Sequence, residues 1–275
     1  MRAASSSGQR FFAQYAQGSS RAAHMKFRLK AFGLHVLGSV CLLSLILGCL
    51  YLGWYRWPGW YLAGALSISL MLMGIDVVLG PLLTFLVASP RKPRRELARD
   101  VSVIVAIQLV AASYGIWTLW NGRPLYYTYS EGYLEMVQAQ DLDPQQIALG
   151  QKLNPTLAPH WYSRPRWIYA PLPKDPKLAT EIASAAISGG DDVIDLPRYY
   201  QPWAAGSADL RQRLQPLDKV KQLDKKDKQV AAARLRQLGF APEQPHMLPM
   251  SGKGRPLVAV IDPATTKIAA LVRVD

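Results

Sequence analysis

Three long apolar runs within the first 120 residues constrain the fold of this 275-residue chain more than any other feature. The runs extend over residues 31–55, 60–88 and 101–120, and almost no charged side chain interrupts them. A helix needs about 20 apolar residues to cross roughly 30 Å of hydrocarbon. The runs therefore predict three transmembrane helices; the alternative is three helices buried inside a soluble protein.

Clustered Lys and Arg residues predict the orientation of these helices. One cluster precedes the first run and the other lies between the second and third runs: Lys26, Arg28 and Lys30, then Arg91, Lys92, Arg94, Arg95 and Arg99. Basic residues in short loops stay on the cytoplasmic side, and Tyr and Trp gather at lipid–water boundaries. Tyr and Trp residues occur at the opposite ends of the runs, so both basic clusters are expected in the cytoplasm. We interpret the larger cluster as a topology anchor, with a nucleic-acid or acidic-lipid site as the alternative.

The chain is expected to have three parts. Residues 1–24 lack acidic residues and strong periodicity, which predicts a disordered cytoplasmic extension. Because Met25 opens a basic flank that looks like a natural start, an over-long start is the alternative for this segment. Residues 25–120 form the three-helix transmembrane region, and residues 121–275 form one domain outside the cytoplasm. Cys41 and Cys49 both lie in the first run, where a disulfide is not expected.

Local signals in residues 121–275 predict a mixed α+β domain. Alternating residues predict a strand over 133–139, and Asp143-Pro144 has the form of a capped helix start, for a helix that ends near residue 153. Two more helices are expected over 177–187 and 218–238, each followed by glycine. Residues 257–262 and 268–274 predict a terminal hairpin. The fold class is therefore an α-helical membrane bundle followed by an α+β domain.

Two segments of the outer domain are rich in Pro and aromatic residues, and they predict either packed loops or an exposed surface for a partner. The candidate surface residues are Trp161, Tyr162, Trp167, Tyr199, Tyr200 and Trp203. No metal-ligand spacing, nucleophile elbow or phosphate-binding glycine loop occurs in the sequence. Asp191, Asp192 and Asp195 are best explained as a turn or helix cap, with a cation site as the alternative. We therefore expect no enzyme activity, no cofactor, no metal and no nucleic-acid partner.

Asp76, inside the second run, is the strongest candidate for a functional residue. An ionisable group at that depth costs about 2.5–3.5 kcal/mol on insertion scales, so it is expected to face protein. Gly80-Pro81 should loosen the helix and free a backbone carbonyl near the carboxylate. The expected intramolecular partner is Gln108, with His35 as a less favoured choice. A hydrogen-bonded Asp that joins the three helices is the structural reading; a partner's transmembrane helix or a proton path is the alternative.

Five stretches, in order along the chain, carry a resemblance to a known family. They read MKFRLKAFGLH, LYLGWYRWPGWYLAG, GIDVVLGPLLTFLV, KPRRELARD and LWNGRPLYY. Together they resemble the TfpX/TfpZ family of type IV pilin accessory proteins, also described as FimB-like. DLPRYYQPW and LPMSGKGRPLVAVID extend the likeness toward residue 275.

This resemblance implies a protein of the bacterial inner membrane with a periplasmic outer domain. The implied partners are the lipid bilayer and the type IV major pilin, with minor pilins or inner-membrane assembly proteins as further partners. Before assembly such a pilin is held in this membrane by its apolar amino-terminal helix, with its head in the periplasm. The chain is therefore expected to assist pilus assembly or its balance with retraction.

Small residues on the second run offer one face for a partner helix, because packing of small residues and buried polar groups drives helix association in lipid. That face is expected to contain Ala65 and Ser69, with Asp76 two turns further on. The alternative function is a small membrane subunit of a transport or envelope-synthesis machine, with Asp76 as an ion or proton site. A membrane-anchored periplasmic enzyme is a third reading, for which no acid–base pair is evident.

Overall fold

The computed structural model describes the backbone of residues 5–275 and the side chains of residues 24–275. It divides into two compact units. The first contains the chain up to Gly48 together with Ser67–Trp117, and the second contains Cys49–Leu66 and Thr118–Asp275. The turn between the first two apolar runs thus belongs to the second unit, whereas the sequence assigned it to the membrane part.

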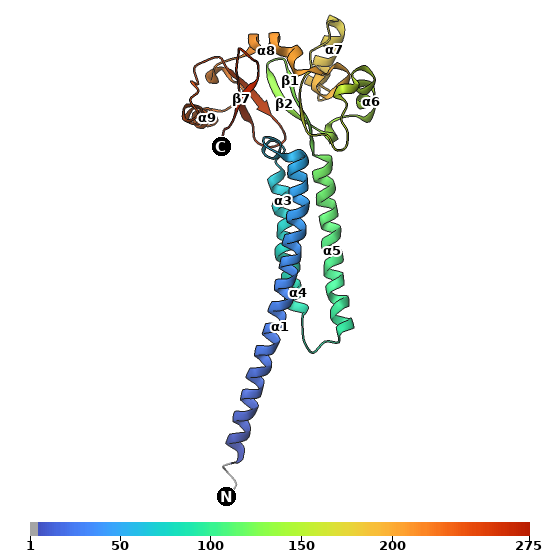
Figure 1. The fold of residues 1–275 in the computed structure, drawn as a ribbon, viewed down its shortest axis with the longest axis vertical. Helices are drawn as coiled ribbons and strands as arrows, with labels where there is room; N and C mark the ends of the chain where they lie inside the picture. Colours follow the sequence, from blue (N-terminus) through green and yellow to red (C-terminus); the bar gives the residue numbers. More distant parts are fainter. Residues whose placement is uncertain (1–4) are drawn as a thin grey trace. The chain divides into compact units, whose positions relative to one another are not determined.

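Three helical stretches are long and apolar enough to cross a membrane: His24–Tyr55, Ala65–Val87 and Arg94–Asn121. They are built from α1 (Ser5–Leu50), α3 (Ala65–Met73), α4 (Gly80–Val87) and α5 (Arg94–Asn121), with π-helical turns at η1 (Tyr51–Tyr55) and η2 (Gly74–Leu79) (Figure 1). Helix α1 begins at Ser5, whereas the sequence predicted disorder for residues 1–24. The Ala, Gln and Arg residues of this segment are good helix formers, so the helix of the first apolar run extends back through them. Residues 1–4 of that prediction lie outside the described residues.

The second long apolar helix begins later than the sequence predicted. Residues Gly59–Leu62 form a separate short helix, α2, and the next long helix starts at Ala65. Gly64 lies between them with φ +63°, a left-handed conformation that glycine adopts without steric cost. The chain therefore turns sharply before the second span instead of entering it at residue 60.

The second unit is built on one seven-stranded sheet in the order β4-β3-β1-β2-β5-β6-β7. The pairs β1–β3 and β2–β5 are parallel, and the other pairs are antiparallel. The strands are β1 (Pro124–Ser130), β2 (Tyr133–Gln138), β3 (Arg166–Tyr169), β4 (Gln201–Pro202), β5 (Met247–Ser251), β6 (Leu257–Ile261) and β7 (Ile268–Arg273). The expected mixed α+β domain and its terminal hairpin are confirmed.

Four longer helices accompany the sheet: α6 (Pro144–Leu153), α7 (Pro176–Ile187), α8 (Ser207–Arg213) and α9 (Lys225–Gln237). Asp143 caps α6 by accepting a hydrogen bond from Gln145 N, as predicted. Helix α9 is shorter than the predicted 218–238, because Asp224 caps it at Asp227 N. Short 3₁₀ turns connect these elements: η3 (Ala139–Asp141), η4 (Pro155–Leu157), η5 (Val193–Asp195), η6 (Pro197–Tyr199), η7 (Trp203–Gly206) and η8 (Leu217–Lys219).

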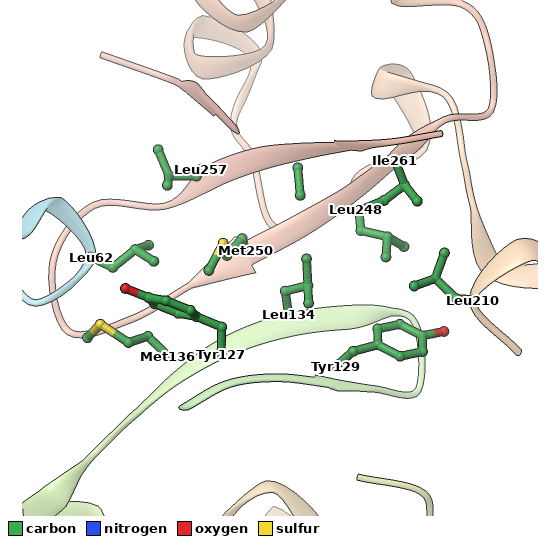
Figure 2. Close-up of a cluster of buried hydrophobic side chains, with 11 residues drawn as sticks. Leu62, Tyr127, Tyr129, Leu134, Met136, Leu210, Leu248, Met250, Leu257 and Ile261 are labelled. Atoms are coloured by element: carbon green, nitrogen blue, oxygen red, sulfur yellow. The ribbon is translucent and has the colours of Figure 1, made fainter. Parts of the chain in front are cut away.

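Three groups of buried side chains fill the second unit. One includes Leu62 of α2 and Leu210 of α8, packed with residues of β1, β2, β5 and β6 (Figure 2). A second joins β1 and β3 to α7, and a third joins β6 and β7 to α9. Both faces of the sheet are thus covered, which explains why every residue of β1 and β6 is buried.

Candidate functional site

The first unit holds a polar group formed by Asp76 of η2 and Gln108 of α5, only 7% and 8% exposed. Gln108 Nε2 lies 3.2 Å from the backbone oxygen of Asp76 and 3.4 Å from its Oδ1. Burial in a helix bundle makes such pairing necessary, since neither group has water to replace it. The structure therefore brings together the two residues that the sequence paired; their function stays a prediction.

The backbone explains why the Asp76 carbonyl needs a side-chain donor. In the π-helical turn η2, Gly80 N–H donates to Ile75 O, five residues back, and not to Asp76 O. The next residue, Pro81, has no N–H to offer. Asp76 O thus loses both of its helical donors, and the Gln108 amide replaces them.

Gly80 is part of the same arrangement. A Cβ built at Gly80 would overlap the amide group of Gln108, so this close approach requires glycine. Pro81 is also buried. The motif Gly80-Pro81 therefore creates both the unpaired carbonyl and the space through which Gln108 reaches it.

A cavity of about 200 Å³ adjoins this polar group. Gly38 and Ser39 of α1 and Ala112 of α5 line it, together with Asp76 and Gln108. Leu42 and Leu109 also line it and are 48% and 52% exposed, so the cavity reaches the surface of the helix unit. Gln108 Oε1 is buried and accepts no hydrogen bond from any residue that the structure describes. The cavity is thus a mostly apolar recess, and the buried Oε1 atom lies on the side of Gln108 that faces Gly80.

His35, the less favoured partner of Asp76, lines the same cavity but is engaged elsewhere. Its Nδ1 lies 2.6 Å from Thr84 Oγ1 of α4, which ties α1 to α4. Ala65 and Ser69 are 2% and 3% exposed. They were expected to offer one face to a partner helix; both are buried in the structure, and their part in such a contact stays a prediction.

The basic residues 91–99 lie at the start of α5 and in the turn before it. Lys92 Nζ is 2.7 Å from Asp100 Oδ2, while Arg94, Arg95 and Arg99 are exposed. The exposed cations agree with a solvated loop.

The aromatic residues proposed as one outer surface do not form one. Trp161 and Tyr162 are 70% and 63% exposed, but Tyr200 is 4% exposed and belongs to the core. Trp167 and Trp203 pack together with ring centroids 5.8 Å apart, and Trp203 Nε1 donates to Thr266 O. Strand β3 and the turn η7 place these rings against the sheet, so the proline-rich segments are mostly packed structure. Tyr199 is half-buried.

The acidic group around Asp192 and Asp195 is a cap, as expected. Asp192 and Asp195 form a reciprocal capping box around η5, and Tyr133 donates a 2.7 Å hydrogen bond to Asp192. Burial raises the pKa of Asp195 and of nearby Glu135 to about 6. Among the residues that the structure describes, no group of three or more His, Cys, Asp or Glu is placed to hold a metal ion.

Sequence reasoning missed how the outer turn 56–66 joins the C-terminal strands. Leu62 is fully buried in the sheet core. The Gly254 N–H donates to Leu62 O, and a Cβ at Gly252 would lie 2.6 Å from that same oxygen. Gly252 and Gly254, one and three residues after β5, therefore allow the turn to approach the sheet. The two glycines of the motif SGKG indicate a close backbone approach, but nothing in the sequence shows which segment approaches them.

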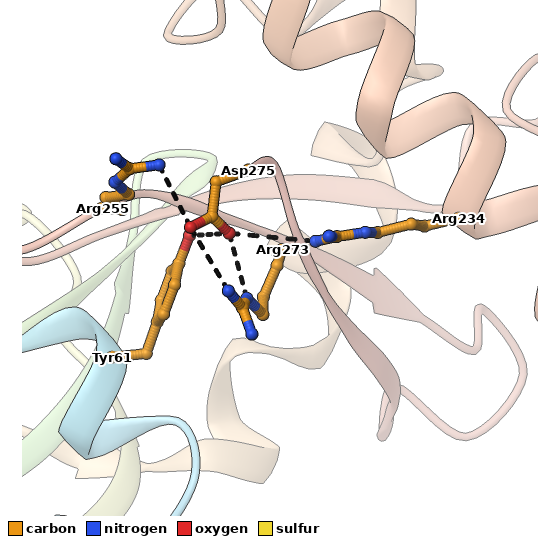
Figure 3. Close-up of polar contacts among 5 residues, drawn as sticks. All are labelled: Tyr61, Arg234, Arg255, Arg273 and Asp275. Atoms are coloured by element: carbon orange, nitrogen blue, oxygen red, sulfur yellow. Dashed lines mark hydrogen bonds and ion pairs between the residues drawn. The ribbon is translucent and has the colours of Figure 1, made fainter.

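A cluster of charges reinforces this contact (Figure 3). The Tyr61 hydroxyl donates a hydrogen bond to the Asp275 carboxylate. The same carboxylate forms ion pairs with Arg255 at 3.1 Å and with Arg273 at 3.0 Å. Arg234 of α9 lies 3.9 Å away. These partners hold the pKa of Asp275 at about 2, chiefly through the hydrogen bond from Arg273.

Comparison with known proteins finds that the chain is similar to fimbrial assembly proteins of Dichelobacter nodosus. It is 32% identical over 116 residues to the fimbrial assembly protein of serogroups C1 and C2, a match that covers 42% of this chain and 88% of the relative. The serogroup I protein is also 32% identical over 116 residues, but the match covers only 45% of that relative's length. The serogroup E1 protein is 25% identical over 254 residues, 90% of this chain and 96% of the relative. No family model and no solved structure matches.

Proposed function

Because the chain belongs to the family of fimbrial assembly proteins represented by these relatives, we propose that it is a multi-pass accessory factor for type IV fimbria assembly, or for the balance of assembly with retraction. In this proposal the three apolar helices cross the bacterial inner membrane, with the basic loop in the cytoplasm and the second unit in the periplasm. The protein binds the type IV major pilin and catalyses no reaction.

The cavity beside Gln108 is the observation that carries this proposal to the level of residues. Helices associate in lipid through close packing at small residues and through buried hydrogen bonds. Gly38, Ser39 and Ala112 supply the small residues, and the exposed side chains of Leu42 and Leu109 give the recess an apolar opening. An apolar helix, such as the membrane segment of a pilin, matches this recess.

The alternative, an ion or proton site at Asp76 in a transport machine, receives less support. Most of the cavity's lining is apolar, and the Asp76 carboxylate is already contacted by Gln108. An ion path needs polar groups or water in succession through the membrane. The cavity suits a helix surface better than a hydrated ion.

The first test of the proposal is a clean deletion with plasmid complementation, comparing sheared surface pilin with the total pilin pool of the cell. Loss of surface pilin while the pool persists is the expected result for an assembly factor. A fall in both would move the role to pilin stability. Normal surface pilin and normal twitching would contradict the proposal.

The cavity itself is tested by a matched pair of glycine substitutions on α1. Gly38 lines the cavity, whereas Gly33 is exposed and lies outside its lining; neither has a neighbouring atom within 4 Å of an added Cβ. Gly38→Leu should fill the recess and lower surface pilin, and Gly33→Leu should complement fully. A photo-crosslinker at Leu109 should capture pilin, whereas one at Leu34, which is 74% exposed and outside the lining, should not. Equal capture at both positions would remove the cavity from the proposal.

A further inference from the structure

The second unit contains a cavity of about 360 Å³ whose walls are aromatic. Trp54 contributes from the last turn of the first apolar helix and Trp57 from the residues after it. Tyr127 of β1 and Trp167 of β3 contribute from the sheet. Arg56 and Arg164 also line it, and both are exposed. No acidic residue is part of the lining. The cavity thus combines flat apolar surfaces with two positive charges.

The cavity lies at the end of the sheet nearest to the apolar helices along the chain. Its residues 53–58 overlap and directly follow the span His24–Tyr55. Strand β1 begins three residues after α5, and β3 runs parallel to β1 with Arg166 beside Tyr126. The loop before β3, which carries Arg164, therefore enters the sheet at the end where α5 delivers the chain. Ile268 and Leu271 of β7 complete the apolar lining of the cavity.

The two arginines have no counter-charge of their own. Neither Arg56 nor Arg164 makes an ion pair within the part of the chain that the structure describes. Arginine binds phosphate oxygens through a planar set of donors, and Trp and Tyr rings favour the headgroup level of a bilayer. Trp57 is 46% exposed, and Trp161 and Tyr162 stand exposed on the loop that leads to Arg164. These features match the phosphate and glycerol portion of a lipid.

We propose that this cavity is a binding site for the headgroup of an anionic phospholipid in the leaflet next to the second unit. The arginines take the phosphate, and the aromatic walls cover the glycerol and the first acyl carbons. This inference rests on the membrane placement given under the proposed function, but not on the pilin. A bound lipid would hold the base of the sheet at the bilayer surface.

The test uses the full chain purified in detergent, with native mass spectrometry to count bound lipid during titration with phosphatidylglycerol. Wild type should retain one phosphatidylglycerol in preference to phosphatidylcholine. Arg56→Gln with Arg164→Gln should weaken that binding about tenfold, since each basic residue near an anionic lipid adds about fivefold or less. Arg56→Lys with Arg164→Lys should keep most of it. Lys219→Gln with Lys221→Gln, an equal loss of charge at two exposed residues outside the cavity, should leave it unchanged.

Three outcomes would overturn the proposal. Unchanged phosphatidylglycerol binding by the Arg-to-Gln pair, with wild-type thermal unfolding as evidence that it is folded, would show that the arginines do not hold the lipid. Equal retention of phosphatidylcholine would show that the site does not select an anionic headgroup. Displacement of the lipid by millimolar inorganic phosphate would point to a free anion. Pilin is absent from this assay, so a failure here is separate from the surface-pilin result that tests the proposed function.

Discussion

Tyr61 and Asp275 lie 214 positions apart in the sequence, yet the Tyr61 hydroxyl donates a 2.8 Å hydrogen bond to the Asp275 carboxylate. Tyr61 belongs to α2 in the turn between two apolar helices, and Arg273 also covers its ring, 5.0 Å from the centroid. Burial and the neighbouring carboxylate raise the pKa of Tyr61 to about 12. The hydroxyl therefore stays a donor throughout the physiological pH range.

Removing either partner should weaken the second unit. We expect Tyr61→Phe and Asp275→Asn each to lower the free energy of unfolding by about 1 kcal/mol, because hydrogen bonds to charged groups are worth about 1.5–3 kcal/mol and this one is partly exposed. In a double-mutant cycle the two changes should be less than additive. Thermal unfolding of the full chain in detergent measures them. Strict additivity would mean that the hydrogen bond contributes nothing.

Acid should weaken the same contact only at very low pH. The pKa of Asp275 is about 2 in the folded protein, below its ordinary value of 3.8, so its stabilising contribution is complete above pH 4. The contribution is lost as pH falls through 2. Wild type and Asp275→Asn should therefore converge in unfolding temperature toward pH 2 and differ most above pH 4.

The close approach of the outer turn to the residues after β5 makes Gly254 sensitive to any side chain. A Cβ there would overlap Tyr61 O and approach Gly64 N to 2.7 Å. Gly254→Ala should therefore cost about 1–3 kcal/mol, the usual range for forced overpacking. Gly53→Ala is the matched control, since an added Cβ at Gly53 meets no atom within 4 Å. If both variants unfold at the same temperature, the turn is not held against Gly254.

The arrangement around Gly80 and Pro81 predicts a coupling inside the apolar helices. Gly80→Ala should displace Gln108 and destabilise the helix unit, whereas Gly74→Ala, whose added Cβ meets nothing within 4 Å, should not. Pro81→Ala restores a backbone N–H that can bond Asp76 O. In that background Gln108→Leu should therefore cost less than it does alone, by about 1 kcal/mol. Equal costs in both backgrounds would show that Gln108 does not compensate for the proline.

Glu135 and Asp195 predict a second pH dependence, of opposite sign to that of Asp275. Burial raises both pKa values to about 6, so the folded state holds protons that the unfolded state has already lost. Stability should therefore fall as pH rises from about 4 to 6 and then level off. Glu135→Gln should be more stable than wild type at pH 7 by about 1 kcal/mol, and indistinguishable at pH 4. Glu181→Gln, at an exposed position of α7, is the control and should change neither.

Elements with strong local signals could be predicted from the sequence. The Asp143-Pro144 start of α6, the end of α7 before Gly189 and the β6–β7 hairpin are all encoded by neighbouring residues. The Asp76–Gln108 contact could be anticipated as well, because a buried carboxylate in an apolar helix needs a polar partner and few polar residues occur in the third run.

Elements that depend on distant partners could not be predicted from the sequence. Strand β5 contains Pro249, which argues against a strand at the interior of a sheet. Its parallel partner β2 pairs only with Met250 and Ser251, so Pro249 is spared from that ladder. Strand β3 similarly lies in a proline-rich segment and needs β1 beside it. The role of Leu62 in the sheet core depends on residues almost 200 positions later.

That last dependence gives the second unit an order of events. The turn that carries Leu62 is synthesised between the first two apolar helices, long before residues 248–261 that cover it. Before β5 and β6 are made, the Leu62 side chain has no strand packed over it, and its backbone oxygen lacks the hydrogen bond from Gly254 N. The core of this unit is therefore completed only after residues 248–261 have been synthesised. A chain that stops before β5 would leave Leu62 uncovered. The exposed apolar side chain would then distinguish incomplete copies from complete ones for quality-control proteases.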